Sequence, residues 1–357
     1  MIDLARPVGV AIIGAGNVAE TSHLPAIRAQ RPEIEVRAVV DVDLDRARAF
    51  AQRWQIPAAY GDVETMLRET TPDLAIVCTP PIVHRDAVVA CLDAGAWVWC
   101  EKPPTLSLAE YDEIAAHEVD GGPYVSYVFQ HRFGSGARAL REHIRTGRLG
   151  QPLVGICHTL WYRDDAYYQV PWRGKWATEG GGPTMGHGIH QMDLMLALMG
   201  EWTEVRAATG TLARDVETED VSMAIARFAS GAMVSVVNSV LSPRETSYLR
   251  FDFTKATVEL THLYGYDNTN WRWTPAELGE LEENEASSHA AQLRYLVDDL
   301  RHARRPEASG DDGRRVLAFI AALYASAATG APVTPDQITP DSPFYHSMSG
   351  RKENVHA

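Results

Sequence analysis

The stretch Trp97-Val98-Trp99-Cys100-Glu101-Lys102-Pro103-Pro104 decides how this chain of 357 residues is interpreted. Its apolar run predicts a short buried strand, and the strand must end before the two prolines, which cannot donate to a sheet ladder. Glu101 and Lys102 therefore fall at the carboxyl end of a strand, where ligands bind in an open α/β sheet. A desolvated lysine at this place is suited to moving protons. The alternative is a surface ion pair that happens to end a strand.

Composition and charge restrict the class of protein. The net charge is -14 at pH 7 and 45% of the residues are hydrophobic, which is an ordinary globular composition without the basic footprint of a nucleic-acid-binding protein. The length predicts two domains, or three. No run reaches the length of a membrane span, and the first ten residues lack a signal-peptide core, so we expect a cytoplasmic protein that handles small molecules. The four cysteines lack metal-site spacing and are interpreted as reduced structural thiols.

A dinucleotide-binding fingerprint follows the first apolar run. Residues 8–13 predict a strand, residues 14–19 read Gly-Ala-Gly-Asn-Val-Ala, and a helical pattern extends to about residue 30. Gly14 permits the tight turn, Gly16 lets the backbone approach a pyrophosphate, and Ala19 lets helix and strand pack closely. A lone fingerprint is weak evidence, so its context has to support it.

The second strand, residues 35–40, ends at Asp41. An acidic side chain at this place can bind both ribose hydroxyls of an adenosine and would repel a 2′-phosphate. Because no arginine follows Asp41 until Arg46, we expect NAD as the cofactor and NADP as the less favoured one. Asp41 could also cap a helix over residues 44–53, and both roles can hold together.

Two more strands complete the pattern. Residues 73–78 and 96–100 predict buried strands, with a helix from His84 to about residue 94 between them. Strands that alternate with helices predict a parallel sheet. One candidate follows each of the four strands, and this agreement favours a functional edge of the sheet: Gly14, Asp41, Thr79 and Lys102. The default interpretations of Thr79 and His84 are a turn hydroxyl and a helix-capping side chain.

The order of these motifs resembles that of the Gfo/Idh/MocA family, the relatives of glucose–fructose oxidoreductase and inositol dehydrogenase. The resemblance rests on residues 14–19, on Cys-Thr-Pro-Pro at 78–81 with His84, and on Glu-Lys-Pro at 101–103. It continues through Arg132-Phe133, Trp172-Arg173, Gly180-Gly181-Gly182, residues 188–193 and residues 309–314. It implies a Rossmann domain followed by an α/β domain with a large, mostly antiparallel open sheet. It also implies NAD(P)-dependent oxidation or reduction of CH–OH groups of sugars, cyclitols or related polyols.

The resemblance assigns roles to single residues. Lys102 would be the catalytic lysine, with His190 relaying the proton and Glu101 beside the cofactor. The residues expected at the cofactor are Gly14, Gly16, Asn17, Val18, Asp41, Thr79, Pro80, His84, Glu101 and Lys102. The residues expected at the substrate are Lys102, Arg132, Trp172, Arg173, His187 and His190. For Arg132, a contact with a polyol or with a cofactor phosphate competes with a solvated side chain.

The helix expected over residues 185–199 departs from the family pattern. Many members place an aspartate four residues before the histidine that corresponds to His190, and here that position is Gly186. Either His187 substitutes as a catalytic residue, or Lys102 and His190 act alone, or redox chemistry has been lost and the protein is a non-catalytic NAD- and sugar-binding sensor. Two histidines and Asp193, spaced by three, share a helical face and invite a zinc interpretation. No glutamate-containing zinc motif is present, so we expect no metal.

We place a domain boundary after the glycine pair at residues 121–122, with an NAD(P)-binding domain over 1–123 and a substrate-binding and oligomerisation domain over 124–357. Residues 124–129 are expected to form the first strand of the second domain. Five strands between residues 153 and 254 without intervening helices predict an antiparallel sheet. In the family another subunit often covers such a sheet, so we expect a homodimer or homotetramer. The aromatic residues between 161 and 176 could form a sugar-stacking wall, a subunit contact or simple packing.

Overall fold

The computed structural model describes residues 6–351, which form two compact units. The first unit contains residues 6–105, 110–128 and 289–313, and the second contains residues 106–109, 129–288 and 314–351. Compactness thus places residues 289–313 with the amino-terminal part of the chain. The domain limits of 1–123 and 124–357 stay a prediction.

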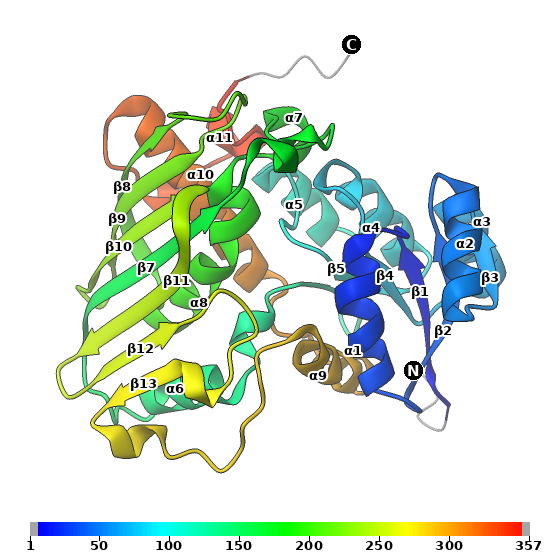
Figure 1. Cartoon of the computed structure of the whole chain (residues 1–357), viewed down its shortest axis with the longest axis horizontal. Helices are drawn as coiled ribbons and strands as arrows, with labels where there is room; N and C mark the ends of the chain where they lie inside the picture. Colours follow the sequence, from blue (N-terminus) through cyan, green and yellow to red (C-terminus); the bar gives the residue numbers. More distant parts are fainter. Residues whose placement is uncertain (1–5, 352–357) are drawn as a thin grey trace. The chain divides into compact units, whose positions relative to one another are not determined.

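The first unit is built on a six-stranded sheet in which all neighbouring strands are parallel. Its strand order is β3-β2-β1-β4-β5-β6, the order of the doubly wound fold that binds dinucleotides. The predicted parallel sheet is confirmed (Figure 1). The strands are β1 (Val8–Ile13), β2 (Ile34–Val40), β3 (Ala58–Tyr60), β4 (Leu74–Val77), β5 (Trp97–Cys100) and β6 (Val125–Tyr127).

Helices connect these strands and cover the sheet. The π-helix η1 (Ala19–His23) leads into α1 (Leu24–Ala29), and α9 (His289–Arg301) packs against α1 although it comes from far along the chain. Apolar residues of α9 at positions 293, 296, 297 and 300 join the same core as Leu24 and Ile27, the spacing of one buried helical face. The remaining helices are α2 (Leu44–Trp54), α3 (Val63–Thr70), α4 (His84–Asp93) and α5 (Leu108–Ala115).

The strand predicted over residues 124–129 forms, but its expected place in the second domain was wrong. The run of residues 124–129, expected to open the second domain, contributes β6, which pairs in parallel with β5 in the first sheet. The apolar run predicts that a strand forms but does not say which strand it joins. β3 was not predicted, because a strand of three half-buried residues leaves no clear alternation.

The second unit holds a seven-stranded sheet in the order β13-β12-β11-β7-β10-β9-β8. All its neighbours are antiparallel except β10 and β7, which are parallel, so the mostly antiparallel sheet is confirmed. The strands are β7 (Pro152–Tyr162), β8 (Trp202–Gly210), β9 (Val221–Phe228), β10 (Met233–Ser239), β11 (Leu241–Phe253), β12 (Thr257–Thr261) and β13 (Trp271–Thr274).

Helices cover one face of this sheet. α8 (Ile189–Met199) contacts β7 and β11, and Phe319 of α10 (Asp311–Thr329) packs edge-on against Trp202 of β8. Burial alternates along β9, where Ala224 and Ala226 are buried while Met223 and Ile225 are exposed. The other α- and π-helices described in this unit are α6 (Ser135–Arg145), α7 (Trp176–Glu179), the π-helix η5 (Thr184–Gly188) and α11 (Pro343–His346). Short 3₁₀ helices lie between these elements: η3 (Gln130–Arg132), η4 (Asp165–Gln169), η6 (Asn268–Asn270), η7 (Ala276–Gly279) and η8 (Pro335–Gln337). Within residues 6–351, no helix combines the length and the apolar character that a bilayer crossing requires.

Candidate active site

The turn after β1 has two glycines with different roles. Gly14 has a φ of 101°, and a Cβ there would lie 2.9 Å from the carbonyl oxygen of Cys78, so packing at the ends of β1 and β4 requires glycine. A Cβ at Gly16 would meet no protein atom within 4 Å. The backbone at Gly16 is therefore open toward a ligand, which supports the predicted approach of a pyrophosphate. Asn17 and Val18 continue this turn into η1, with Val18 at its N-cap position.

Asp41 lies at the end of β2 and is buried. Its Oδ2 accepts hydrogen bonds from the Ala15 amide at 3.0 Å and from Arg46 Nε at 2.9 Å, while Oδ1 accepts from the Asp43 amide at 3.0 Å and from Arg46 Nη2 at 2.5 Å. Burial alone would raise the pKa of Asp41, but the hydrogen bonds from Arg46 and the two amides outweigh it and lower that pKa. The carboxylate is thus ionised and tied to the glycine turn.

The helix-capping alternative for Asp41 was wrong. The N-cap of α2 is Asp43, whose side chain accepts a hydrogen bond from the amide of Arg46. Three aspartates stand at alternate positions, 41, 43 and 45, and only the backbone conformation distinguishes the cap from its neighbours. Arg46, which the sequence places one turn into the helix, reaches back to the very carboxylate expected at the ribose.

Thr79 and His84 lie after β4. The Thr79 hydroxyl is buried and has no hydrogen-bond partner among the described residues, so it is not the expected turn hydroxyl. The methyl carbon of Thr79 lies 3.3 Å from the Cβ position of Gly14, which places an unpartnered polar atom near the glycine turn. Buried polar groups are normally hydrogen-bonded, and a bound cofactor would supply the missing partner. The open side of Gly16 and this hydroxyl together fit NAD.

His84 braces two loops rather than capping a helix with its side chain. Its Nδ1 lies 2.9 Å from the Pro103 carbonyl oxygen and its Nε2 lies 2.9 Å from the Thr79 carbonyl oxygen. Burial lowers the pKa of His84. The ring therefore joins the loop that follows β4, which contains Pro80, to the loop that follows β5. The predicted cofactor role of His84 would then be indirect.

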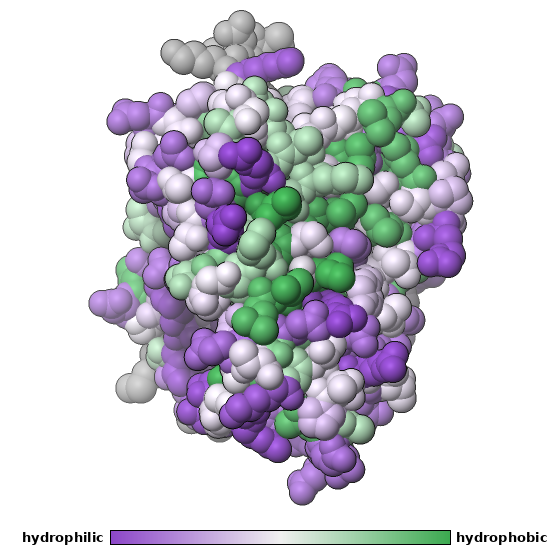
Figure 2. All heavy atoms as spheres, turned by 90° about the vertical axis from the view of Figure 1, so that its left-hand side faces the viewer, coloured by the Kyte–Doolittle hydropathy of each residue, from purple (hydrophilic) through white to green (hydrophobic). Residues whose placement is uncertain are grey.

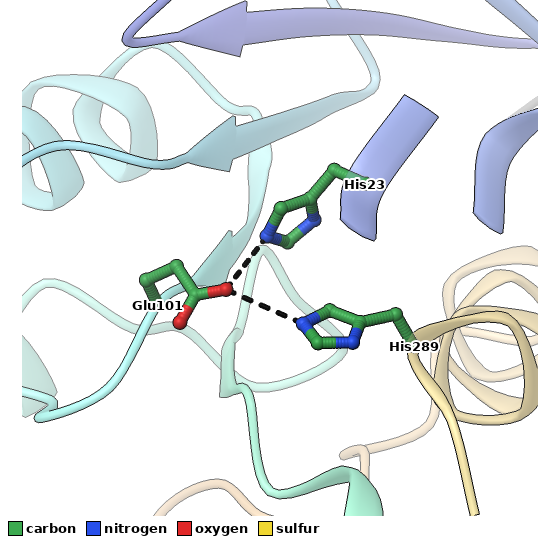
Figure 3. A group of neighbouring side chains, drawn as sticks. All are labelled: His23, Glu101 and His289. Atoms are coloured by element: carbon green, nitrogen blue, oxygen red, sulfur yellow. Dashed lines mark hydrogen bonds and ion pairs between the residues drawn. The ribbon is translucent and has the colours of Figure 1, made fainter. Parts of the chain in front are cut away.

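Glu101 is the centre of a cluster that the sequence did not predict. Its Oε1 lies 2.9 Å from His23 Nε2 and 3.4 Å from His289 Nε2, and both rings point at this one oxygen (Figure 3). Its Oε2 accepts from the amide of Lys102 at 3.2 Å. The surface ion pair considered as an alternative is wrong, because the Glu101 carboxylate is buried and bound to imidazoles.

The cluster fixes the charge of Glu101. Burial would raise the pKa of Glu101, but the hydrogen bonds from His23 and His289 prevail and hold it well below its usual range. Burial lowers the pKa of His23 despite the neighbouring carboxylate. An ionised Glu101 with a neutral His23 therefore stands directly before Lys102, whose peptide the cluster anchors.

These three side chains also have metal-ligand chemistry, with donor atoms all within 4.8 Å of one another. Both ring nitrogens converge on a single oxygen at hydrogen-bonding distance (Figure 3). Two N–H donors satisfy this arrangement without an ion. The geometry is thus that of a hydrogen-bonded cluster.

In the second unit, His190 lies in the first turn of α8 and is buried. Its Nε2 lies 3.0 Å from the Tyr264 hydroxyl, and its ring centroid lies 4.9 Å from that of His131. The contacts of His190 with Tyr264 and His131 were not predicted. A tyrosine at hydrogen-bonding distance can orient an imidazole for proton transfer.

Arg132 forms a buried ion pair with Asp193 of α8. Its Nε donates to Oδ2 at 2.7 Å and its Nη2 donates to Oδ1 at 2.5 Å, in the bidentate geometry that fixes a guanidinium on a carboxylate. Arg132 is 5% and Asp193 is 0% exposed, so the solvated alternative for Arg132 is wrong. Both Asp193 oxygens accept hydrogen bonds from Arg132, so this carboxylate is not available as the zinc ligand considered for the helical face.

The aromatic loop contributes to packing around Arg173. Its guanidinium lies 3.9 Å from the ring centroid of Tyr167 and 4.3 Å from that of Trp172, and its Nη1 lies 3.3 Å from Oε1 of Glu179. His187 packs against Trp161 with ring centroids 5.1 Å apart. Trp172, Arg173 and His187 thus belong to one cluster around Tyr167, and their contact with a substrate stays a prediction.

Comparison with known proteins identifies relatives over nearly the whole chain. Residues 8–128 match a family model described as "Oxidoreductase family, NAD-binding Rossmann fold", and residues 137–259 match the "GFO/IDH/MocA C-terminal domain". The D-glucoside 3-dehydrogenase of Escherichia coli (strain K12) is 28% identical, with 92% of this chain and 98% of that protein covered. The myo-inositol 2-dehydrogenase of Thermotoga maritima is 25% identical, with 86% and 92% covered.

Solved structures show the same fold. The aldose-aldose oxidoreductase from Caulobacter crescentus, complexed with glycerol, is 25% identical with a TM-score of 0.82, covering 92% of this chain and 100% of that one. The WlbA dehydrogenase from Bordetella pertussis, in complex with NADH and UDP-GlcNAcA, is 24% identical with a TM-score of 0.80, covering 92% and 99%.

Proposed function

The chain belongs to the Gfo/Idh/MocA family of NAD-binding oxidoreductases, and from this premise we propose that it transfers hydride between NAD and a hydroxyl or keto carbon of a sugar, cyclitol or related polyol. The observation that carries this proposal is the position of Lys102, at the carboxyl end of β5 in the nucleotide-binding sheet, with its peptide anchored by the Glu101 cluster. The relatives named above are dehydrogenases and an oxidoreductase, which favours a catalytic protein over a sensor.

Each candidate residue has a proposed task. When bound, NAD supplies the nicotinamide that accepts or donates hydride. The turn at residues 14–18 holds the pyrophosphate, Asp41 the ribose hydroxyls, and the Thr79 hydroxyl a polar atom of the cofactor. Lys102 donates a hydrogen bond to the reacting oxygen and stabilises negative charge as it develops there. His190, oriented by Tyr264, takes or returns the proton.

NADH formation against a panel of sugars, cyclitols and polyols tests the proposal. We expect at least one member to reduce NAD, as followed by the absorbance of NADH. Calorimetry on the same panel is the control, because it detects binding without turnover. Binding of a sugar in the presence of NAD with no NADH formed would favour the sensor instead.

We expect the Asp41→Ser variant to bind NAD about 10–100-fold more weakly, since hydrogen bonds to a charged group contribute about 1.5–3 kcal/mol. The same change releases Arg46, which can then hold a 2′-phosphate, so NADP should gain relative to NAD. Calorimetric titration of both dinucleotides measures the two affinities. Asp43→Ser is the matched control, because Asp43 caps α2 and is exposed. An unchanged preference in Asp41→Ser would remove Asp41 from the ribose.

We also propose that a second copy of the chain covers the open face of the seven-stranded sheet, giving a homodimer or homotetramer. This face exposes Val154, Met223 and Ile225 by 50%, 56% and 51%, and Met233 of β10 stands opposite Val154 in the register. Figure 2 shows hydrophobic residues gathered in the middle of this side between hydrophilic margins. Contiguous exposed apolar surface of this kind marks interaction sites.

Sedimentation velocity tests this assembly. The wild type should sediment as an oligomer, and Ile225→Asp should shift it toward the monomer because a charge cannot be buried unpaired in the interface. Val119→Asp is the control, since Val119 is 54% exposed and belongs to the first unit rather than to this sheet. A monomeric wild type would refute the proposal.

We propose a cytoplasmic location on the state of the cysteines. All four are free and buried, as expected of structural thiols in a reducing compartment. Fractionation of cells that express the tagged protein would reveal any other location.

A further inference from the structure

Position 186 lacks the carboxylate that the family pattern places one turn before His190, yet a carboxylate lies beside it. A Cβ built on Gly186 would meet Oε1 of Glu179 at 3.6 Å, an ordinary van der Waals distance. Glu179 is the last residue of α7 and precedes the triple glycine. An acidic group from a different element thus occupies the space next to the glycine.

Glu179 is buried, with 5% of its surface exposed. Its Oε2 accepts from the amide of Gly174 at 2.6 Å, and its Oε1 lies 3.3 Å from Nη1 of Arg173. An ionised carboxylate in such a place is costly unless it is paired and hydrogen-bonded. Arg173 provides the pairing, and the amide satisfies the second oxygen.

Contacts continue from Arg173 to one of the two histidines. Nη1 of Arg173 also donates to the hydroxyl oxygen of Tyr167, and that hydroxyl lies 3.5 Å from Nε2 of His187. Because a guanidinium has no acceptor, the tyrosine oxygen must accept from Arg173, and its own proton is left to point at the imidazole. The order Glu179, Arg173, Tyr167, His187 is therefore directional.

The backbone supports a functional interpretation of this region. Residues Thr184–Gly188 form the π-helix η5 immediately before α8, and single π-turns within helices occur frequently at functional sites. The π-turn carries both Gly186 and His187, so the position without a side chain and the histidine lie on the same turn.

We propose that Glu179 supplies the carboxylate missing at Gly186 and acts as a positioning residue, holding Arg173 and Tyr167 so that the Tyr167 hydroxyl is directed at His187. The expected effects on kcat rest on the proposed function. In this proposal a carboxylate orients His187 and not His190, whose orientation depends on the Tyr264 hydroxyl.

Reciprocal substitution tests the inference. Glu179→Gln removes the charge but keeps the shape, and kcat should fall at least about tenfold. This loss should be smaller than the ~10²–10⁴-fold contribution of a general acid or base, because Glu179 acts through other residues. Adding Gly186→Asp to Glu179→Gln should restore most of the loss. Gly186→Asp alone should lower kcat, because two carboxylates then crowd one space. NAD affinity should stay unchanged in all three variants, since the dinucleotide site lies in the other unit.

A second measurement does not depend on turnover. The imidazole signals of His187, assigned with a His187→Gln variant, are titrated by NMR. The midpoint should fall in Glu179→Gln, because loss of the carboxylate leaves the charges of Arg163 and Arg173 over the ring of Tyr167. The hydroxyl of Tyr167 faces His187, so these uncompensated charges disfavour the imidazolium. It should recover in the double variant.

Glu245→Gln is the matched control. Glu245 pairs with Arg163 at 3.0 Å, so this change removes a carboxylate from the neighbouring arginine without touching position 186, and kcat should not change. A double variant as impaired as Glu179→Gln, or an unchanged His187 midpoint in Glu179→Gln, would overturn the inference and leave Glu179 as a residue of loop structure. If the wild type oxidises no member of the panel, the proposed function fails and the NMR comparison still decides the role of Glu179.

Discussion

We expect the Lys102→Met variant to keep its affinity for NAD and to lose about 10²–10⁴-fold in kcat, the usual contribution of a general acid–base group. Methionine preserves the length and apolar stem of the side chain but removes the ammonium group that would bind the reacting oxygen. Lys102 follows β5, and its amide is held by the Glu101 carboxylate, so the backbone at this place should survive the substitution. Steady-state kinetics and calorimetric titration of NAD separate the two effects.

The control for this experiment is Lys255→Met, because Lys255 is exposed between β11 and β12 and has no proposed role. Its kcat should equal that of the wild type. Turnover in Lys102→Met that matches the wild type would end the proposed mechanism, while a parallel loss of NAD affinity would assign Lys102 to cofactor binding alone.

The second large effect is expected on stability. Arg132→Met should lower the free energy of unfolding by about 3–5 kcal/mol, because it removes the guanidinium that binds both oxygens of the buried Asp193 carboxylate. Both groups are almost inaccessible, with 5% and 0% of their side chains exposed. Denaturant-induced unfolding followed by fluorescence measures the change.

Two variants make this result specific. Arg132→Met combined with Asp193→Leu should recover much of the loss, since apolar residues of similar volume often replace a buried pair without cost. Arg145→Met breaks a pair whose members are 71% and 54% exposed, and such surface pairs contribute about 0–1 kcal/mol. Equal losses in Arg132→Met and Arg145→Met would show that burial of the Arg132 pair does not determine its contribution.

The parts of the fold that follow from short-range pattern were predictable. The strands that precede Gly14, Asp41, Thr79 and Lys102 were found because buried parallel strands are continuous apolar runs, and their carboxyl ends meet at one edge. The sheet to which residues 124–129 belong could not be predicted, because an apolar run carries no information about its partner strand. β12 and β13 were missed for a similar reason, since short strands rich in polar and aromatic residues resemble loops.

The candidate site shows the same limit. His23 and His289 bind one oxygen of Glu101 although 266 positions separate the histidine of α9 from that of η1 (289 − 23), and no local spacing brings them together. The sequence left Arg132 as a solvated or ligand-binding side chain, because its partner Asp193 lies 61 positions away. In the structure, Nε and Nη2 of Arg132 donate to the two carboxylate oxygens of Asp193. Glu179 gave no motif at all, because its relation to Gly186 depends on how α7 is folded against η5.

The packing of α9 on α1 has a consequence for how the protein is made. Residues 8–128 leave the ribosome well before residues 289–301 are synthesised. During that interval the nascent nucleotide-binding sheet lacks the α9 residues that pack with Leu24 and Ile27, and Glu101 lacks its contact with His289. The first unit can therefore be completed only late in translation. A fragment that ends after the first half of the chain would lack α9, expose the apolar surface that α9 covers, and tend to aggregate rather than fold into a nucleotide-binding domain.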